Sequence, residues 1–226
     1  MKNTYYLIIA LFVFILQSCE SKKETKENLA ENNTATYENV LDVPVEKLAV
    51  VVNIDSLGFF NHNSQNLETE IPSATIEKEL KQVNSKFDVC QAVKDKSAKI
   101  LKDNKYDFEM MKELKQIKLP TDLIEEKHLK EIKFDELKKQ ITQNDLLVIN
   151  VKSGLDYNPD NKKEYIAKTY IYLSILDLKN KALKYNETIG GTKYIDQEIK
   201  NLTPDNLSKL IKESVNETLE IIDKKY

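Results

Sequence analysis

The side chains of this sequence that could act as nucleophiles or metal ligands are few. The chain has two cysteines, Cys19 and Cys90, and two histidines, His62 and His128. A serine or cysteine enzyme needs a base beside its nucleophile, most often a histidine, and a metal site needs several ligands. So small a set favours covalent modification of the protein at Cys19 over catalysis by the protein.

Ser56 is the strongest hydrolase candidate. The run IDSLG at 54–58 follows a predicted strand and resembles the nucleophile block of Gly-Asp-Ser-Leu serine esterases. Ile54 stands where that family has a glycine, and the family's Asp-x-x-His pair is missing, because Glu125 is the residue three before His128. We therefore keep a hydrolase using Ser56 as an alternative only, and expect no enzyme activity.

Glu125 and His128 are spaced to share one helix face, as the ligands of di-iron helix bundles are. Such sites need a second copy of the pair and further carboxylates from other helices, and this chain has one copy. It also has no Walker loop, no dinucleotide glycine pattern and no zinc cysteine pair. We expect no metal and no cofactor.

The first residues have the layout of a signal peptide. A positive charge at Lys2 precedes the uncharged apolar segment 4–16. As a helix this segment would reach roughly 20 Å, short of the roughly 30 Å hydrocarbon core of a bilayer. The run LQSC at 16–19 resembles the lipobox of bacterial lipoproteins, in which a small residue precedes an invariant cysteine, although Gln17 departs from the usual small or branched residue.

The lipobox resemblance implies that Cys19 receives a diacylglycerol and further acyl chains such as palmitate, and that residues 1–18 are cleaved off. Each buried methylene contributes about 0.8 kcal/mol, so two or three chains hold a protein stably on a membrane. Glu20, where an aspartate would favour inner-membrane retention, points to the outer membrane, at its periplasmic face or at the cell surface. An ordinary secretory peptide and an uncleaved anchor are the alternatives.

Composition separates a tether from one domain. Residues 19–44 are polar, so we expect a disordered tether, and residues 45–226 suffice for one globular domain with a core. The chain has 34 Lys+Arg against 37 Asp+Glu, and none of the basic residues is an arginine. This balance argues against nucleic-acid binding, which depends on clustered cations. Cys90 has no partner left for a disulfide, and its place in a predicted helix favours burial.

Hydrophobic periodicity predicts a mixed α/β domain with a sheet of about four to five strands, an antiparallel C-terminal meander and three to four helices. Strands are predicted at 48–54, 106–110, 146–151, 165–178 and 182–189, the last ended by Gly190-Gly191, and helices from Ser73 to Leu101, after Pro120, and from Pro204. In the strand 165–178, one set of alternate residues should face helices, and the other set should be partly exposed to solvent.

This element order resembles the compact α/β domains of the amino-terminal part of Tol translocation protein B and of the lipoproteins that activate penicillin-binding proteins. The resemblance spans residues 48–224 and implies a non-enzymatic protein-interaction module in envelope assembly or regulation, with an unidentified envelope protein as partner. It carries no catalytic residues. A lipoprotein that captures a small apolar ligand between sheet and helices is the alternative.

Tyr170 and Tyr172, with Tyr185 on the next strand, are the candidate interaction surface. Tyrosine is enriched in interfaces because it supplies much contact area at low entropic cost. The alternative is that a helix covers this face.

Cys19 generates the first prediction. Replacing it, Cys19→Ala, removes the only thiol that a lipobox enzyme could acylate, so the variant should accumulate as unlipidated precursor or soluble protein. Fatty-acid analogue labelling and membrane fractionation measure this. A variant that still labels and stays in the membrane fraction contradicts the lipobox interpretation.

Overall fold

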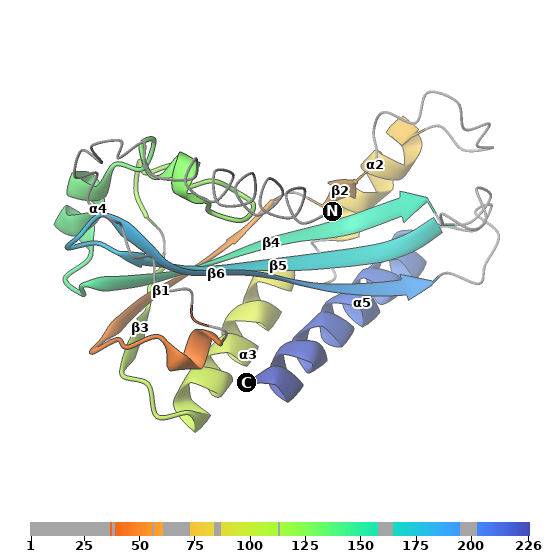
Figure 1. Cartoon of the computed structure of the whole chain (residues 1–226). Coiled ribbons are helices and arrows are strands. Elements are labelled where there is room, and N and C mark those ends of the chain that lie inside the picture. Colours follow the sequence, from red (N-terminus) through yellow and green to blue (C-terminus); the bar gives the residue numbers. More distant parts are fainter. Residues whose placement is uncertain are drawn as a thin grey trace, which may run out of the picture. The chain divides into compact units, whose positions relative to one another are not determined.

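The computed structural model describes Tyr37 and residues 39–55, 57–60, 73–83, 87–112, 114–157, 165–194 and 203–226. Its strands are β1 (Leu48–Ile54), β2 (Gly58–Phe59), β3 (Phe108–Met110), β4 (Asp145–Tyr157), β5 (Tyr165–Asp177) and β6 (Ala182–Tyr194). They form one sheet in the order β3-β1-β4-β5-β6, with β2 paired to β4 (Figure 1). β1 runs parallel to β3 and β4, and β4, β5 and β6 are antiparallel. The predicted mixed α/β class with an antiparallel C-terminal meander is confirmed.

The helices of the described residues are α2 (Ser73–Val83), α3 (Val89–Asp103), α4 (Phe134–Gln140) and α5 (Pro204–Lys225), with 3-10 turns η1 (Val40–Asp42) and η2 (Glu126–His128). The prediction of one helix from Ser73 to Leu101 is wrong. α3 begins anew because the Asp88 carboxylate caps it, accepting the Gln91 N–H at 2.9 Å. The predicted helical region after Pro120 contains only η2 and α4.

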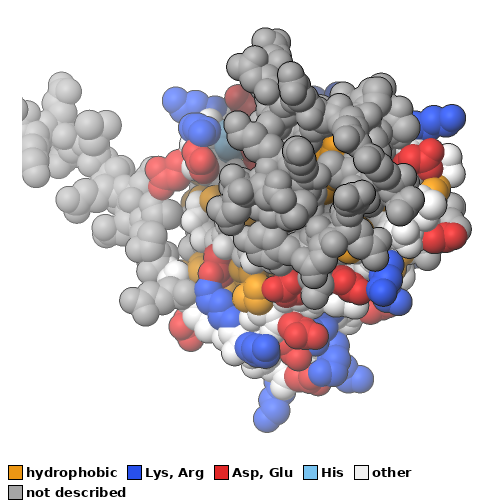
Figure 2. Space-filling view, turned by 90° about the vertical axis from the view of Figure 1, so that its right-hand side faces the viewer, with side chains coloured by type: hydrophobic (Ala, Val, Ile, Leu, Met, Phe, Trp, Pro, Cys, Tyr) orange, Lys and Arg blue, Asp and Glu red, His pale blue; other side chains and the backbone are white. Residues whose placement is uncertain are grey.

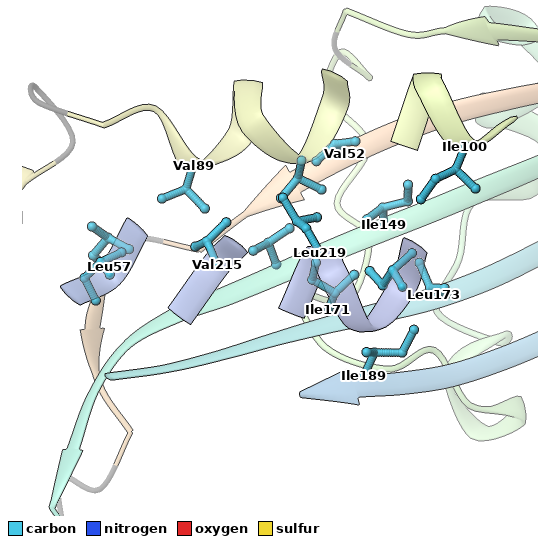
Figure 3. Close-up of a cluster of buried hydrophobic side chains, with 14 of the residues drawn as sticks. Val52, Leu57, Val89, Ile100, Ile149, Ile171, Leu173, Ile189, Val215 and Leu219 are labelled. Atoms are coloured by element: carbon cyan, nitrogen blue, oxygen red, sulfur yellow. The ribbon is translucent and has the colours of Figure 1, made fainter. Parts of the chain in front are cut away.

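One face of the sheet carries helices α3 and α5 (Figure 1). Apolar side chains of this face and of the helices form one core, which we call the helix-side core. In β5 the alternate residues Ala167, Ile171, Leu173 and Ile175 are buried in this core, as the alternation predicts. Figure 3 shows strand side chains meeting Val89 and Ile100 of α3 and Val215 and Leu219 of α5. Each such aliphatic side chain contributes about 1.5–3 kcal/mol when fully buried.

Among the residues that the structure describes, those of the chain between β3 and β4 cover the opposite face over part of its length. The chain between β3 and β4 folds over it, and we call residues 114–141 the cover. A second core forms there between the cover and one end of the sheet, with Val51, Val148 and Leu176 among the buried strand residues. β4 continues from Val148 to Tyr157, and its antiparallel partner β5 begins at Tyr165, well before Leu176. The cover therefore leaves a second stretch of this face to other contacts.

α5 lies unusually close to β6 and β5 through buried hydroxyl groups. Ser214 Oγ donates to Thr169 Oγ1 at 2.9 Å, and Thr218 Oγ1 donates to the Thr169 carbonyl at 3.4 Å. Gly191 allows this approach, because a Cβ there would stand 2.3 Å from Thr218 Oγ1. The prediction that Gly190-Gly191 ends the strand is therefore wrong: both glycines lie inside β6, and Gly191 is there for helix packing.

The strap, residues 39–44, packs on the domain although it falls inside the predicted tether 19–44. Val43 is 2% exposed, and the Tyr106 hydroxyl donates to the Leu41 carbonyl at 2.6 Å. The apolar residues of the strap reach the helix-side core, which offsets the entropy of ordering it. The structured part of the chain thus begins before residue 45.

Gly191→Ala tests the close docking of α5. The added methyl meets Thr218 Oγ1 and should lower the free energy of unfolding by about 1–3 kcal/mol, as overpacking does, measured by urea denaturation. In a Thr218→Ala background the nearest atom is gone, so the cost of Gly191→Ala should be smaller there. Costs that simply add would show that the two residues do not constrain each other.

Candidate interaction surface

Tyr170 and Tyr172 lie side by side on β5, on the face that carries the cover and just beyond its end. In the register of β4 and β5, Tyr170 is opposite Lys152, and Tyr172 is opposite Asn150. Both tyrosines are half-buried, so part of each side chain stays accessible. The structure thus brings together two of the three tyrosines that the sequence predicts as an interaction surface.

The two rings form a shelf on the sheet. They are 25° from parallel with centroids 6.2 Å apart. The Tyr170 ring lies over Gly190 of β6, where a Cβ would stand 2.8 Å from two ring carbons, so only glycine lets the ring lie this close to the strand. Phe60 stands edge-on to Tyr170 at 5.5 Å and 76°, and Lys152 Nζ lies 5.6 Å from the Phe60 ring centroid. We call Phe60, Lys152, Tyr170 and Tyr172 the aromatic face.

Gly154 positions Phe60 at this face. β2 pairs in parallel with β4, with Gly58 opposite Gly154, and a Cβ on Gly154 would stand 1.9 Å from the Gly58 carbonyl oxygen. The Phe60 N–H continues the pairing by donating to the Leu155 carbonyl at 2.9 Å. Phe59 is buried in the helix-side core, and Phe60 is left to pack on Tyr170. A glycine inside a strand is a sequence signal for such a close backbone approach.

Asn150 marks the boundary between the cover and the aromatic face. Its side chain is buried, and its amide nitrogen donates at 2.8 Å to the backbone carbonyls of both Pro120 and Asp122. Its amide oxygen accepts a bond from Asn53 Nδ2 at 3.0 Å. One side chain thereby satisfies two carbonyls of a segment without regular structure and fixes where that segment crosses the sheet.

Two carboxylates lie near Tyr172. Asp55 directly follows β1, with its N–H bonded to the Val151 carbonyl at 3.1 Å, and Asp122 is held through its carbonyl by Asn150. Burial is the largest cause that raises the pKa of the Tyr172 hydroxyl, and the charges of Asp122 and Asp55 raise it further. The protonated, neutral tyrosine is therefore the form present at physiological pH.

Tyr185 is not part of this surface, and the predicted grouping of three tyrosines is corrected in this respect. It faces the helix-side core, is 5% exposed, and its hydroxyl donates to Glu187 Oε2 at 2.6 Å. Pairing between β5 and β6 shifts near Ile175, where a β-bulge adds one residue to β6. A bulge reverses the side on which every later residue lies, and no residue type in the hairpin announces it.

The other predicted site residues divide into those outside and those inside the described ranges. Cys19, Ser56 and His62 lie outside them. His128 Nδ1 accepts the Glu125 backbone N–H at 3.1 Å, and the Glu125 carboxylate pairs with Lys127 at 2.6 Å, so the pair serves the η2 turn. Cys90 is half-buried on α3 and packs against the helix-side core.

The described residues contain neither a metal-ligand cluster nor a membrane-spanning helix. No group of three or more His, Cys, Asp or Glu side chains there is placed to hold a metal ion. No described helix combines the length and the apolar character that crossing a bilayer requires.

The helix-side core leaves little room for a ligand. A cavity of about 40 Å³ lies between the sheet, α3, α5 and the strap, with Ile149, Leu173 and Ile222 among its lining residues. Sites for small molecules usually measure about 300–1,000 Å³. The alternative of apolar ligand capture at this place finds no support in a cavity of this size.

Comparisons with known proteins give similarity in structure only. No family model and no curated protein matches the sequence. A neuraminyllactose-binding hemagglutinin homolog from Helicobacter pylori is 12% identical with a TM-score of 0.36, covering 80% of this chain and 84% of that one. Lipoprotein GNA1162 from Neisseria meningitidis is 12% identical with a TM-score of 0.33, covering 78% and 99%.

A third solved structure, the hypothetical protein CT253 from Chlamydia trachomatis, is 8% identical with a TM-score of 0.32, covering 78% of this chain and 96% of that one. Likeness at this level assigns neither a family nor an activity. None of the three is a Tol protein or an activator of penicillin-binding proteins, so the resemblance drawn from element order stays a prediction.

Asn150→Ala tests the boundary of the aromatic face. It removes two hydrogen bonds to the cover, each worth about 0.5–1.5 kcal/mol, and should lower the free energy of unfolding by about 1–3 kcal/mol, with faster amide exchange around Pro120 and Asp122. Asn53→Ala is the matched control, because it removes one bond of the same cluster and frees no segment. Equal losses in the two variants would contradict a special role for Asn150.

Proposed function

We propose that this protein is a lipid-anchored lipoprotein of the bacterial cell envelope that works without catalysis, as a protein-interaction module, and contacts its partner through the aromatic face. The observation that carries the proposal is the partly accessible shelf of Tyr170 and Tyr172 beside Phe60, on a sheet face that the cover leaves in part uncovered. Rigid aromatic side chains on a fixed strand are the usual anchors of protein interfaces.

The anchor half of the proposal rests on the sequence. Segment 4–16, the lipobox at 16–19 and the polar stretch after Cys19 together favour a lipidated N-terminus followed by a tether. Glu20 after the cysteine favours the outer membrane. A tethered domain searches for its partner within the reach of its linker, so a modest contact surface suffices for binding.

Surface charge supports a protein partner over nucleic acid. On the face shown in Figure 2, basic and acidic side chains are intermixed on the described surface. At the aromatic face itself, Lys168 Nζ pairs with Asp156 at 2.7 Å, and Lys152 lies over Phe60. Nucleic-acid surfaces instead concentrate uncompensated cations along a groove or stripe.

Photo-crosslinking in the native cell tests the proposed function. A benzoylphenylalanine at Thr188, an exposed residue opposite Tyr172 on β6, should trap a defined envelope protein. The same probe at Glu217, exposed on α5 on the other side of the sheet, is the matched control.

The crosslink at Thr188 should disappear in a Tyr170→Ala, Tyr172→Ala background whose circular dichroism and melting are unchanged, because the shelf is lost and the helix-side core is not. Adducts that are the same at Thr188 and Glu217, or that survive loss of both rings, would reject the aromatic face as the contact surface.

A further inference from the structure

We propose that the partner presents a basic segment to the aromatic face, with a lysine or arginine side chain seated on Tyr172 beside Asp55 and Asp122. This inference rests on the proposed function and adds the chemistry of the partner. It follows from three features of the described residues. Asp55 and Asp122 have carboxylates without an ion pair or hydrogen bond there, the ring of Tyr172 is partly accessible, and Lys152 already lies over Phe60 at the other end of the aromatic face.

The carboxylates of Asp55 and Asp122 have no ion pair or hydrogen bond with any described residue, unlike other carboxylates of this sheet. Asp145 pairs with Lys184 at 2.7 Å, and Asp156 pairs with Lys168 at 2.7 Å. Asp55 and Asp122 have no such direct partner among the described residues, and the charge of Asp122 acts on Lys127 of the cover only from a distance.

The backbones of Asp55 and Asp122 are held in place before a partner arrives. The Asp55 N–H bonds to β4 at 3.1 Å, and the Asp122 carbonyl accepts from buried Asn150 at 2.8 Å. Asn150, which holds the Asp122 carbonyl, is opposite Tyr172 on β4, and Val151, which holds the Asp55 N–H, is the next residue of that strand. Groups positioned in advance cost less entropy on binding.

The ring of Tyr172 adds attraction for a cation. The face of an aromatic ring is the negative pole of its quadrupole and binds ammonium or guanidinium groups within about 6 Å of the centroid. Lys152 over Phe60 is such a contact, made by the protein itself at the other end of the aromatic face. The face therefore already accommodates a cation on one ring, and Tyr172 has the carboxylates that Phe60 lacks.

Tyrosine hydroxyls add hydrogen-bonding capacity for the partner backbone. In the part of the chain that the structure describes, neither Tyr170 nor Tyr172 has a hydrogen bond through its hydroxyl, whereas Tyr106 bonds to the Leu41 carbonyl and Tyr185 to Glu187. A segment whose basic side chain lies on Tyr172 can thus bond both hydroxyls through its amide groups.

Fluorescence anisotropy with a labelled hexa-arginine peptide tests the inference on the full chain in detergent. Asp55→Asn with Asp122→Asn should weaken binding by about fivefold, the loss expected for two partly exposed ion pairs. The control Glu217→Gln with Glu220→Gln removes the same charge from exposed positions of α5 and should change affinity less than twofold.

Tyr172→Leu, which keeps both carboxylates, should also weaken binding, and Tyr172→Phe, which keeps the ring, should retain most of it. Equal affinity in the aspartate and glutamate double variants would overturn the inference, because binding would then follow net charge alone. Tighter binding of hexaglutamate, or of chitohexaose as a neutral glycan, would overturn it as well. If the Thr188 crosslink persists in the aspartate variant and peptide binding is unaffected, the basic-segment inference fails while the proposed function stands.

Discussion

The buried amide of Asn150 is the interaction on which the rest of this face depends. The cover has no regular structure where it crosses the sheet, so its carbonyl groups have to be satisfied by something other than a helix or a strand. Asn150 satisfies two of them from the middle of β4. The apolar contacts of the cover then lie on one side of this point and the tyrosines on the other, so that one hydrogen-bonding side chain separates a core from a surface.

The two faces of the sheet differ in how they are packed. α5 approaches β6 so closely that Gly191 is required, and buried hydroxyls of Ser214 and Thr218 complete the contact. That face supplies stability. The other face is packed at one end by the cover and carries the aromatic rings at the other end, which we propose as the contact surface for a partner. A rigid helix layer behind the sheet keeps those rings in place.

The sequence predicts those parts of the fold that follow from local pattern. Thr203 and Pro204 mark the start of α5, and the alternation in β5 correctly assigns the helix-facing residues. It fails where a residue acts at long range. Gly191 reads as a strand terminator but serves helix packing, and Tyr185 lies on the opposite face because a bulge shifts β6. Phe60 was missed altogether, since only the pairing of β2 with Gly154 brings it to Tyr170.

The strap has a mechanical consequence for the N-terminal lipid anchor that we propose. The chain enters the domain through the strap and continues into β1, an interior strand that pairs with β3 and β4 in parallel. A pull on the chain before the strap therefore meets buried Val43 and the Tyr106 hydrogen bond before it loads β1. In a protein tethered as proposed, a force applied through the N-terminal segment would have to break these contacts before it reached the sheet that carries the aromatic rings.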